Sequence, residues 1–119
     1  MRRDPRAYLW DVREASRRIT EFVEGIGLEE FCDDALVRSA VERQFEIVGE
    51  ALSQLAKVDP VLASRVPEHR RIIAFRNVLI HGYAALDHPL VWRVIQEDLP
   101  TLGAAVDALL TALGSAAHD

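Results

Sequence analysis

The sequence is nearly free of cysteine, since Cys32 is the only one in 119 residues. A single thiol excludes an intrachain disulfide framework and a cysteine-based zinc site. No run approaches the roughly 18 consecutive apolar residues that a membrane-spanning helix needs, and no apolar signal core follows Met1–Pro5. We therefore expect a cytoplasmic protein without a membrane partner.

The remaining composition is that of an ordinary globular domain. Half of the residues are apolar and 28% are charged, which argues against disorder. A chain of 119 residues can bury a hydrophobic core without covalent staples. We expect a single domain over residues 1–119, with residues 115–119 frayed.

Lysine is also scarce, because Lys57 is the only one and the other thirteen of the fourteen basic residues are arginine. Arginine suits bidentate pairing with phosphate or carboxylate, although a genome that favours arginine codons gives the same bias. The net charge of −5 argues against a nonspecific nucleic-acid binder. That charge is uneven, since residues 65–83 carry +3 whereas residues 25–64 carry −5 and residues 84–119 carry −4.

No long stretch alternates like a β-strand, whereas four segments have helical periodicity. The predicted fold class is therefore all-α, an up-and-down bundle of four main helices. They are predicted near residues 5–23, 34–58, 68 to 80 or 83, and 89–113, with a kink or restart at Pro100. Residues 26–33 and 59–67 are predicted to be connections, and Phe31 is expected to enter the core.

The second predicted helix carries an acidic stripe opposite its apolar face. The stripe consists of Glu42, Glu46 and Glu50, spaced four residues apart. Like charges at this spacing repel each other weakly. A solvated stripe tolerates the repulsion, whereas a stripe that faces arginine side chains benefits from its own charge.

Four chemically active side chains are concentrated near the end of the third predicted helix: Arg76, Asn77, His81 and Tyr83. Packing gives no reason for such a group in an otherwise apolar segment. His81 can act as a general acid or base near neutral pH, and Arg76 can hold a phosphate. RNA supplies its own nucleophile, the 2′-hydroxyl, so these groups suit phosphodiester cleavage without a metal.

Helical geometry separates Arg76 from His81 by about 140° around the axis. They converge on one ligand only if the helix unwinds near Gly82, or if two subunits each supply one of them. Structural roles remain open as well. A histidine at a helix C-terminus interacts favourably with the helix dipole, Arg76 can pair with the acidic stripe, and Tyr83 can be a rim residue.

The spacing of Arg76, His81 and Tyr83 resembles the R-x4-H-x-Y signature of HEPN domains, and more narrowly that of the HepT toxins of HepT–MntA toxin–antitoxin pairs. Residues 41–51 resemble the second-helix block of that family. Residues 81–83, followed by Asp87 and by residues 91–92 and 98–100, resemble its C-terminal half. The similarity therefore covers nearly the whole chain.

This resemblance implies an all-α homodimer in which the motifs of two subunits line a shared cleft. It implies a toxin that is a metal-independent endoribonuclease with no cofactor. In that enzyme His81 transfers protons, Arg76 stabilises the phosphate and Asn77 supports them, and the product is a 2′,3′-cyclic phosphate.

The resemblance also implies a partner, an MntA-like minimal nucleotidyltransferase antitoxin that transfers AMP to Tyr83. The added negative charge would keep RNA phosphate away from the site. The alternative function is a non-catalytic module that binds a nucleotide or a nucleotidyltransferase. A structural helper, with the motif as a cluster of ion pairs, is a third reading.

Overall fold

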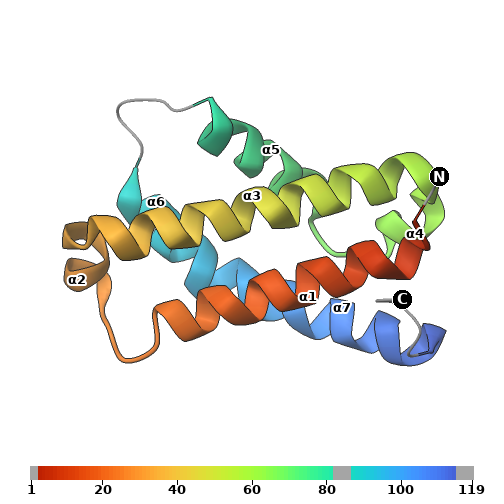
Figure 1. The fold of residues 1–119 in the computed structure, drawn as a ribbon, viewed down its shortest axis with the longest axis horizontal. Helices are drawn as coiled ribbons and strands as arrows, with labels where there is room; N and C mark the ends of the chain where they lie inside the picture. Colours follow the sequence, from red (N-terminus) through yellow and green to blue (C-terminus); the bar gives the residue numbers. More distant parts are fainter. Residues whose placement is uncertain (1–2, 82–86, 115–119) are drawn as a thin grey trace.

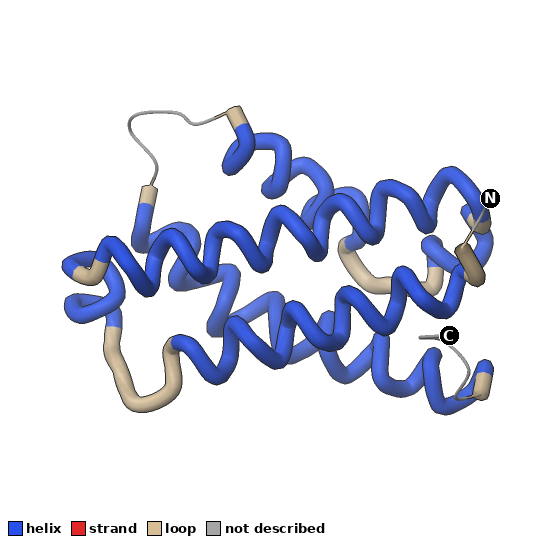
Figure 2. The backbone as a smooth tube through the Cα atoms, viewed as in Figure 1, coloured by secondary structure: helices blue, strands red, loops and turns tan. Residues whose placement is uncertain are grey.

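The computed structural model describes residues 3–81 and 87–114, and it confirms the all-α prediction. Four helices take the places of the predicted ones: α1 (Pro5–Phe22), α3 (Ala35–Val58), α5 (His69–Ile80) and α7 (Leu99–Leu113). Figure 1 shows α1 and α3 side by side and antiparallel, with α7 against α1 and α5 on the outer side of α3. Strands are absent from the described residues (Figure 2).

The two predicted connections contain short helices that the sequence analysis missed. Residues 26–33 include α2 (Leu28–Asp33), and residues 59–67 include α4 (Pro60–Ser64). Asp59 caps α4 because its carboxylate accepts a hydrogen bond from the backbone N–H of Leu62, at 3.0 Å. Helices of one or two turns are too short to produce a recognisable hydrophobic period.

As expected, Phe31 enters the core. It is fully buried in α2, and its ring lies 5.3 Å from that of Trp92 in α6 (His88–Arg93).

The predicted interruption before Pro100 takes the form of a π-helical turn, η1 (Val94–Asp98), between α6 and α7. Pro100 has no backbone N–H, and its ring crowds the carbonyl of Gln96 four residues earlier. The wider π turn occupies this place in the chain, so the last predicted helix is one continuous helical run over residues 88–113 with a π turn before Pro100.

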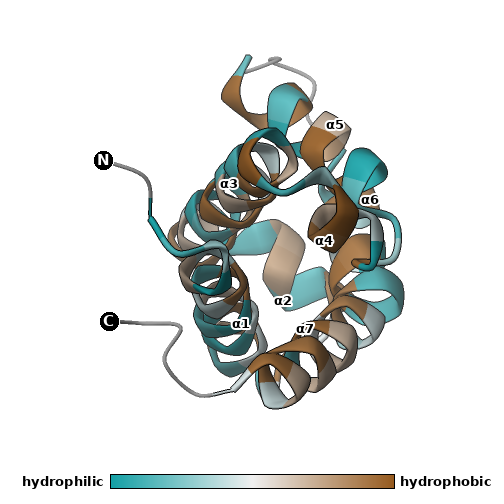
Figure 3. Ribbon diagram, turned by 90° about the vertical axis from the view of Figure 1, so that its right-hand side faces the viewer, coloured by the Kyte–Doolittle hydropathy of each residue, from teal (hydrophilic) through white to brown (hydrophobic). Residues whose placement is uncertain are grey.

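The core lies where the apolar faces of α1, α3, α6 and α7 meet, and Figure 3 shows these faces turned inward. Full burial of one such side chain contributes roughly 1.5–3 kcal/mol. The following core side chains are at most 2% exposed: Leu9, Val12, Ile19, Phe45, Val48, Leu52, Leu55, Leu102 and Val106.

No helix in the described part of the chain combines the length and apolar character needed to cross a membrane.

Helix α5 is attached to the bundle by a much smaller apolar surface. Only Ile72 and Leu79 are buried within it. Phe75 adds an edge-to-face contact with Phe45 of α3, with the ring centroids 5.2 Å apart. Because so little of α5 is committed to the core, most of its surface is free to carry polar side chains.

Candidate active site

The predicted site residues lie at the C-terminal end of α5. Arg76 and Asn77 are in its last turns, and His81 is its C-cap residue. Packing of Leu79 against the bundle turns Asn77 and His81 outward, where both are exposed, and leaves Arg76 half-buried beside α3. Tyr83 and Gly82 lie outside the described residues.

Arg76 crosses α3 at a glycine. A Cβ atom added to Gly49 would lie 2.5 Å from Cγ and 3.2 Å from Cδ of Arg76, and closer still to its Cβ. Any side chain at this position would therefore displace the arginine. The absence of a side chain at Gly49 lets the two helices approach until the aliphatic part of Arg76 rests on the α3 backbone.

The guanidinium of Arg76 is held from two sides. Its Nη2 lies 2.7 Å from Oε2 of Glu50 in α3, and its Nη1 donates a hydrogen bond to Oδ1 of Asn77, at 3.1 Å. The Nε atom is buried and has no hydrogen-bond partner among the described residues. Arg76 is thus fixed in direction, and each Nη atom carries a second N–H beyond the one used in these contacts.

The three glutamates of the acidic stripe have different surroundings. Glu50 contacts Arg76, whereas Glu46 lies 3.4 Å from Arg43 on the same helix. Burial raises the pKa of the Glu42 carboxyl, an effect that the nearby charges of His88 and Arg38 oppose. The structure therefore brings only one member of the stripe to the arginine of the motif.

His81 is oriented by the backbone of its own helix. Its Nδ1 lies 2.7 Å from the carbonyl oxygen of Asn77, which also accepts the backbone N–H of His81 at 3.2 Å. A carbonyl can only accept, so Nδ1 carries the proton in the neutral ring and the lone pair is on Nε2. This tautomer presents Nε2 as the basic atom.

Asn77 links the guanidinium of Arg76 and the imidazole of His81. Its side-chain oxygen is bonded to Arg76 and its carbonyl oxygen to His81. The backbone remains helical through His81, at φ −78° and ψ −6°. The side chains therefore keep the separation of about 140° that helical geometry imposes, and unwinding at Gly82 would come too late in the chain to remove it.

A pocket of about 310 Å³ opens beside Arg76. Ile80 of α5, Glu50 of α3 and Tyr8 of α1 contribute to its lining. At its far side the guanidinium of Arg3 lies 4.9 Å from the centroid of the Tyr8 ring. The pocket thus offers an aromatic face and several charges next to the arginine of the motif.

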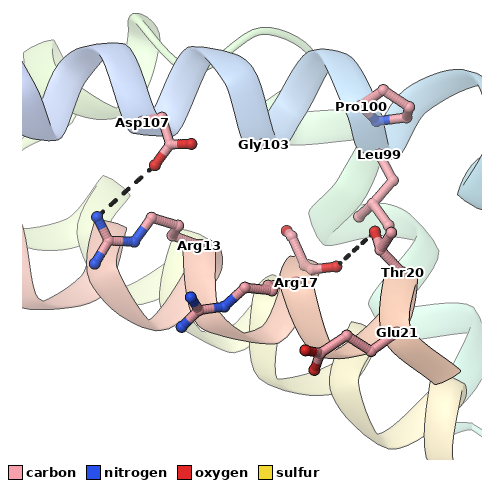
Figure 4. A pocket seen from close by; sticks show the side chains of 9 residues that line it. Arg13, Arg17, Thr20, Glu21, Leu99, Pro100, Gly103 and Asp107 are labelled. Carbon is pink, nitrogen blue, oxygen red and sulfur yellow. Dashed lines mark hydrogen bonds and ion pairs between the residues drawn. The ribbon is translucent and has the colours of Figure 1, made fainter.

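A second pocket, of about 550 Å³, lies between α1 and α7, away from the motif (Figure 4). Arg13 of α1 and Asp107 of α7 form an ion pair at one end of it, with Nη1 and Oδ1 3.7 Å apart. Ser16 also lines it, and its buried hydroxyl has no partner among the described residues. Its lining includes no histidine, so it lacks a side chain that ordinarily exchanges protons near neutral pH.

The residues that the structure describes contain no cluster of three or more His, Cys, Asp or Glu side chains that could hold a metal ion.

Sequence reasoning missed the role of Gly49. The available signal was its position in the middle of a long amphipathic helical segment, where glycine costs roughly 0.5–1 kcal/mol relative to alanine. A glycine in such a place often marks a close approach of two backbones. The sequence alone could not identify Arg76 as the group that approaches it.

Comparison with known proteins adds independent information. Residues 12–109 match the protein family described as Ribonuclease HepT-like. The chain is 35% identical over 102 residues to "Probable ribonuclease HepT" of Thermococcus cleftensis, and the aligned region covers 86% of this chain and 92% of that protein. It is 33% identical over 106 residues to a "Putative RNase" of Methanocaldococcus jannaschii, and here the aligned region covers 89% of this chain and 96% of that protein. No solved structure matches the chain.

Proposed function

Since the chain belongs to the HepT-like ribonuclease family, we propose that it is an endoribonuclease whose active site contains Arg76, Asn77 and His81. The observation that carries the proposal is the pair of hydrogen bonds made by Asn77. They hold a guanidinium and an imidazole at one end of a single helix, with Nε2 of His81 as the basic atom. These are the groups that RNA cleavage by its own 2′-hydroxyl requires.

In the proposed reaction, Nε2 of His81 takes the proton of a ribose 2′-hydroxyl. The 2′-oxygen attacks the adjacent phosphorus and the bond from phosphorus to the 5′-oxygen breaks. The 5′-oxygen leaves as a hydroxyl because it accepts a proton from a second imidazole, which starts the reaction protonated and ends it neutral. The products are a 2′,3′-cyclic phosphate and a 5′-hydroxyl. Arg76 stabilises the negative charge that accumulates on the phosphate oxygens. No step calls for a metal, because the RNA supplies the nucleophile.

A homodimer is part of the proposal. Arg76 and His81 point about 140° apart around α5, so one copy of the chain does not aim both at one phosphate. Two copies that face each other across a cleft would place Arg76 of one subunit opposite the partner subunit's His81. The second imidazole of the reaction would then be the partner's His81.

Regulation by AMP transfer is the remaining part. Tyr83 follows His81 by two residues, so an AMP group on its hydroxyl would add a negative charge close to the motif. That charge would repel the RNA phosphate from Arg76. The proposed partner is a minimal nucleotidyltransferase antitoxin, and this chain is the toxin of the pair.

The test is RNA cleavage by the purified protein in the presence of EDTA. Wild-type protein is expected to release products with 2′,3′-cyclic phosphate ends, and His81→Ala is expected to lower the rate by about 10²- to 10⁴-fold. Arg76→Ala should cause a loss of similar size, while Arg17→Gln serves as the matched exposed-arginine control. Undiminished cleavage in both motif variants would overturn the assignment.

One observation favours the alternative of a non-catalytic nucleotide-binding module. The pocket of about 310 Å³ is lined by Arg76 and Tyr8. A nucleotide could place its phosphate at Arg76 and its base near the ring. Saturable binding of AMP or ATP by calorimetry, in a protein that does not cleave RNA, would establish this alternative in place of the nuclease.

A further inference from the structure

We infer that Arg70 binds a backbone phosphate of the RNA strand away from the point of cleavage, so that the exposed face of α5 is a track for the substrate. The inference rests on the proposed function, because it concerns how RNA is held relative to His81. It adds a binding residue at the opposite end of α5 from the motif.

The geometry of α5 places Arg70 in line with His81. The two residues are eleven positions apart in a continuous helical stretch, so they lie within about 20° of each other around the axis and about 16 Å apart along it. Asn77 falls on the same face, and all three residues are exposed. Figure 1 shows α5 on the side of α3 that is turned away from α1 and α7, so the bundle does not cover this face.

The surface between Arg70 and His81 offers little resistance to a nucleic-acid strand. Ala74, which lies between them, has a side chain of one methyl group and is exposed, so a strand can come close to the helix. Val78, 41% exposed, adds an apolar edge on which a base can rest. Helix α5 contains no aspartate or glutamate between His69 and Ile80, and the carboxylate of its N-cap residue, Glu68, lies 3.9 Å from Arg71.

The charge of Arg70 is available to a ligand, unlike that of its neighbour. Arg71 lies 3.4 Å from a carboxylate oxygen of Asp98 and 3.9 Å from one of Glu68. Arg70 makes no ion pair with any residue that the structure describes. In a chain with a net charge of −5, an exposed cation in line with the proposed base is a specific place for phosphate.

Helix stability does not account for this arginine. The first turn of α5 contains His69, Arg70 and Arg71 and no acidic residue. The helix dipole disfavours cations at an N-terminus and favours anions. A phosphate beside Arg70 would benefit from both the guanidinium and the dipole, whereas the arginine by itself gives α5 no such benefit.

The spacing defines how much RNA the track holds. A stacked strand rises about 3.4 Å per nucleotide, so about 16 Å corresponds to about five nucleotides, and fewer if the strand is extended. A dinucleotide bound at His81 therefore cannot reach Arg70, whereas an eight-nucleotide strand can.

The experiment compares cleavage of RNA oligonucleotides of two, four and eight nucleotides by wild-type protein and by Arg70→Gln. The ratio of the wild-type kcat/KM to that of Arg70→Gln is expected to be about tenfold larger for the eight-nucleotide strand than for the dinucleotide. Arg70→Lys should recover most of the wild-type kcat/KM on the eight-nucleotide strand. Arg71→Gln is the matched control, and its kcat/KM should stay within about twofold of wild type at every length. The Tm of Arg70→Gln should be unchanged or higher, because a cation leaves the helix N-terminus.

A wild-type advantage that does not depend on length would overturn the inference. So would a shift of Arg70→Gln from dimer to monomer in sedimentation, which would assign this face to a second copy of the chain. If the wild-type protein cleaves no RNA, the proposed function fails, and binding of a fluorescent eight-nucleotide RNA at several salt concentrations tests Arg70 on its own. The slope of the logarithm of the binding constant against the logarithm of salt concentration should then become shallower by about 0.7 in Arg70→Gln and stay unchanged in Arg71→Gln. Equal slopes for the two variants would reject the track.

Discussion

Gly49 of α3 and Arg76 of α5 lie so close that a single methyl group cannot be placed between them. The contact couples the packing of two helices to the direction of one functional side chain. Residues that never touch a substrate therefore control where the guanidinium points, and this can be tested at the glycine itself.

Gly49→Ala is expected to displace Arg76 and to loosen its contact with Glu50. Overpacking of this kind destabilises by roughly 1–3 kcal/mol, and RNA cleavage should fall further than the change in folded fraction explains. Urea denaturation and cleavage rates measure the two effects separately. Gly103→Ala is the matched control, because a Cβ there meets nothing within 4 Å in the middle of α7, and it should raise stability by roughly 0.5–1 kcal/mol.

Asn77→Ala removes the side-chain hydrogen bond to Arg76 and leaves the backbone carbonyl that orients His81. We expect kcat to fall about tenfold, since a hydrogen bond to a charged group contributes roughly 1.5–3 kcal/mol, while Tm stays the same because Asn77 is exposed. Steady-state kinetics with a short RNA measure the effect. A change confined to KM would instead mean that Asn77 binds the substrate directly and does not position Arg76.

Glu42→Gln tests the electrostatics of the acidic stripe. Burial raises the pKa of Glu42 above its usual value of 4.5, so the folded state binds the proton more tightly than the unfolded state does. Stability from this group is then full below pH 4.5 and is lost as the pH rises through the raised pKa. We expect Glu42→Gln to be more stable than wild type at neutral pH, with the difference shrinking below pH 4.5. Urea midpoints at several pH values provide the check, and a variant less stable than wild type at neutral pH would mean that the attraction of His88 and Arg38 exceeds the burial cost.

Tyr83 is the predicted acceptor of AMP. Incubation of the purified chain with ATP and a minimal nucleotidyltransferase of the proposed antitoxin class is expected to add the mass of AMP and to reduce RNA cleavage. Tyr83→Phe should lack the adduct and remain active under the same conditions. Intact-mass spectrometry is the measurement, and an adduct of equal mass on Tyr83→Phe would place the modification elsewhere.

The long helices could be predicted because their hydrophobic periods extend over several turns. The sequence also singled out the C-terminal end of α5, because polar side chains are concentrated there in an otherwise apolar segment. Asn77 and His81 are exposed, whereas Arg76 packs on Gly49. The pairing of Arg76 with Glu50 in particular could not be predicted, because three glutamates share one stripe and only the crossing point at Gly49 selects among them. The short helices α2 and α4 were missed for a different reason, because helices of one or two turns contain too few residues to show a hydrophobic period.

The π-helical turn η1 also limits which insertions and deletions this fold tolerates. A π turn accommodates one residue more than the α-helix around it. Deletion of one residue within Val94–Asp98 would restore an unbroken α-helix and rotate α6 by about 100° relative to α7. Val91, now fully buried, would leave the core, and Trp92 would lose its contact with Phe31. Homologous chains that lack the extra residue of the π turn must therefore repack α2 and α6 together. Deletions within residues 94–98 should then coincide with substitutions at positions 31, 91 and 92.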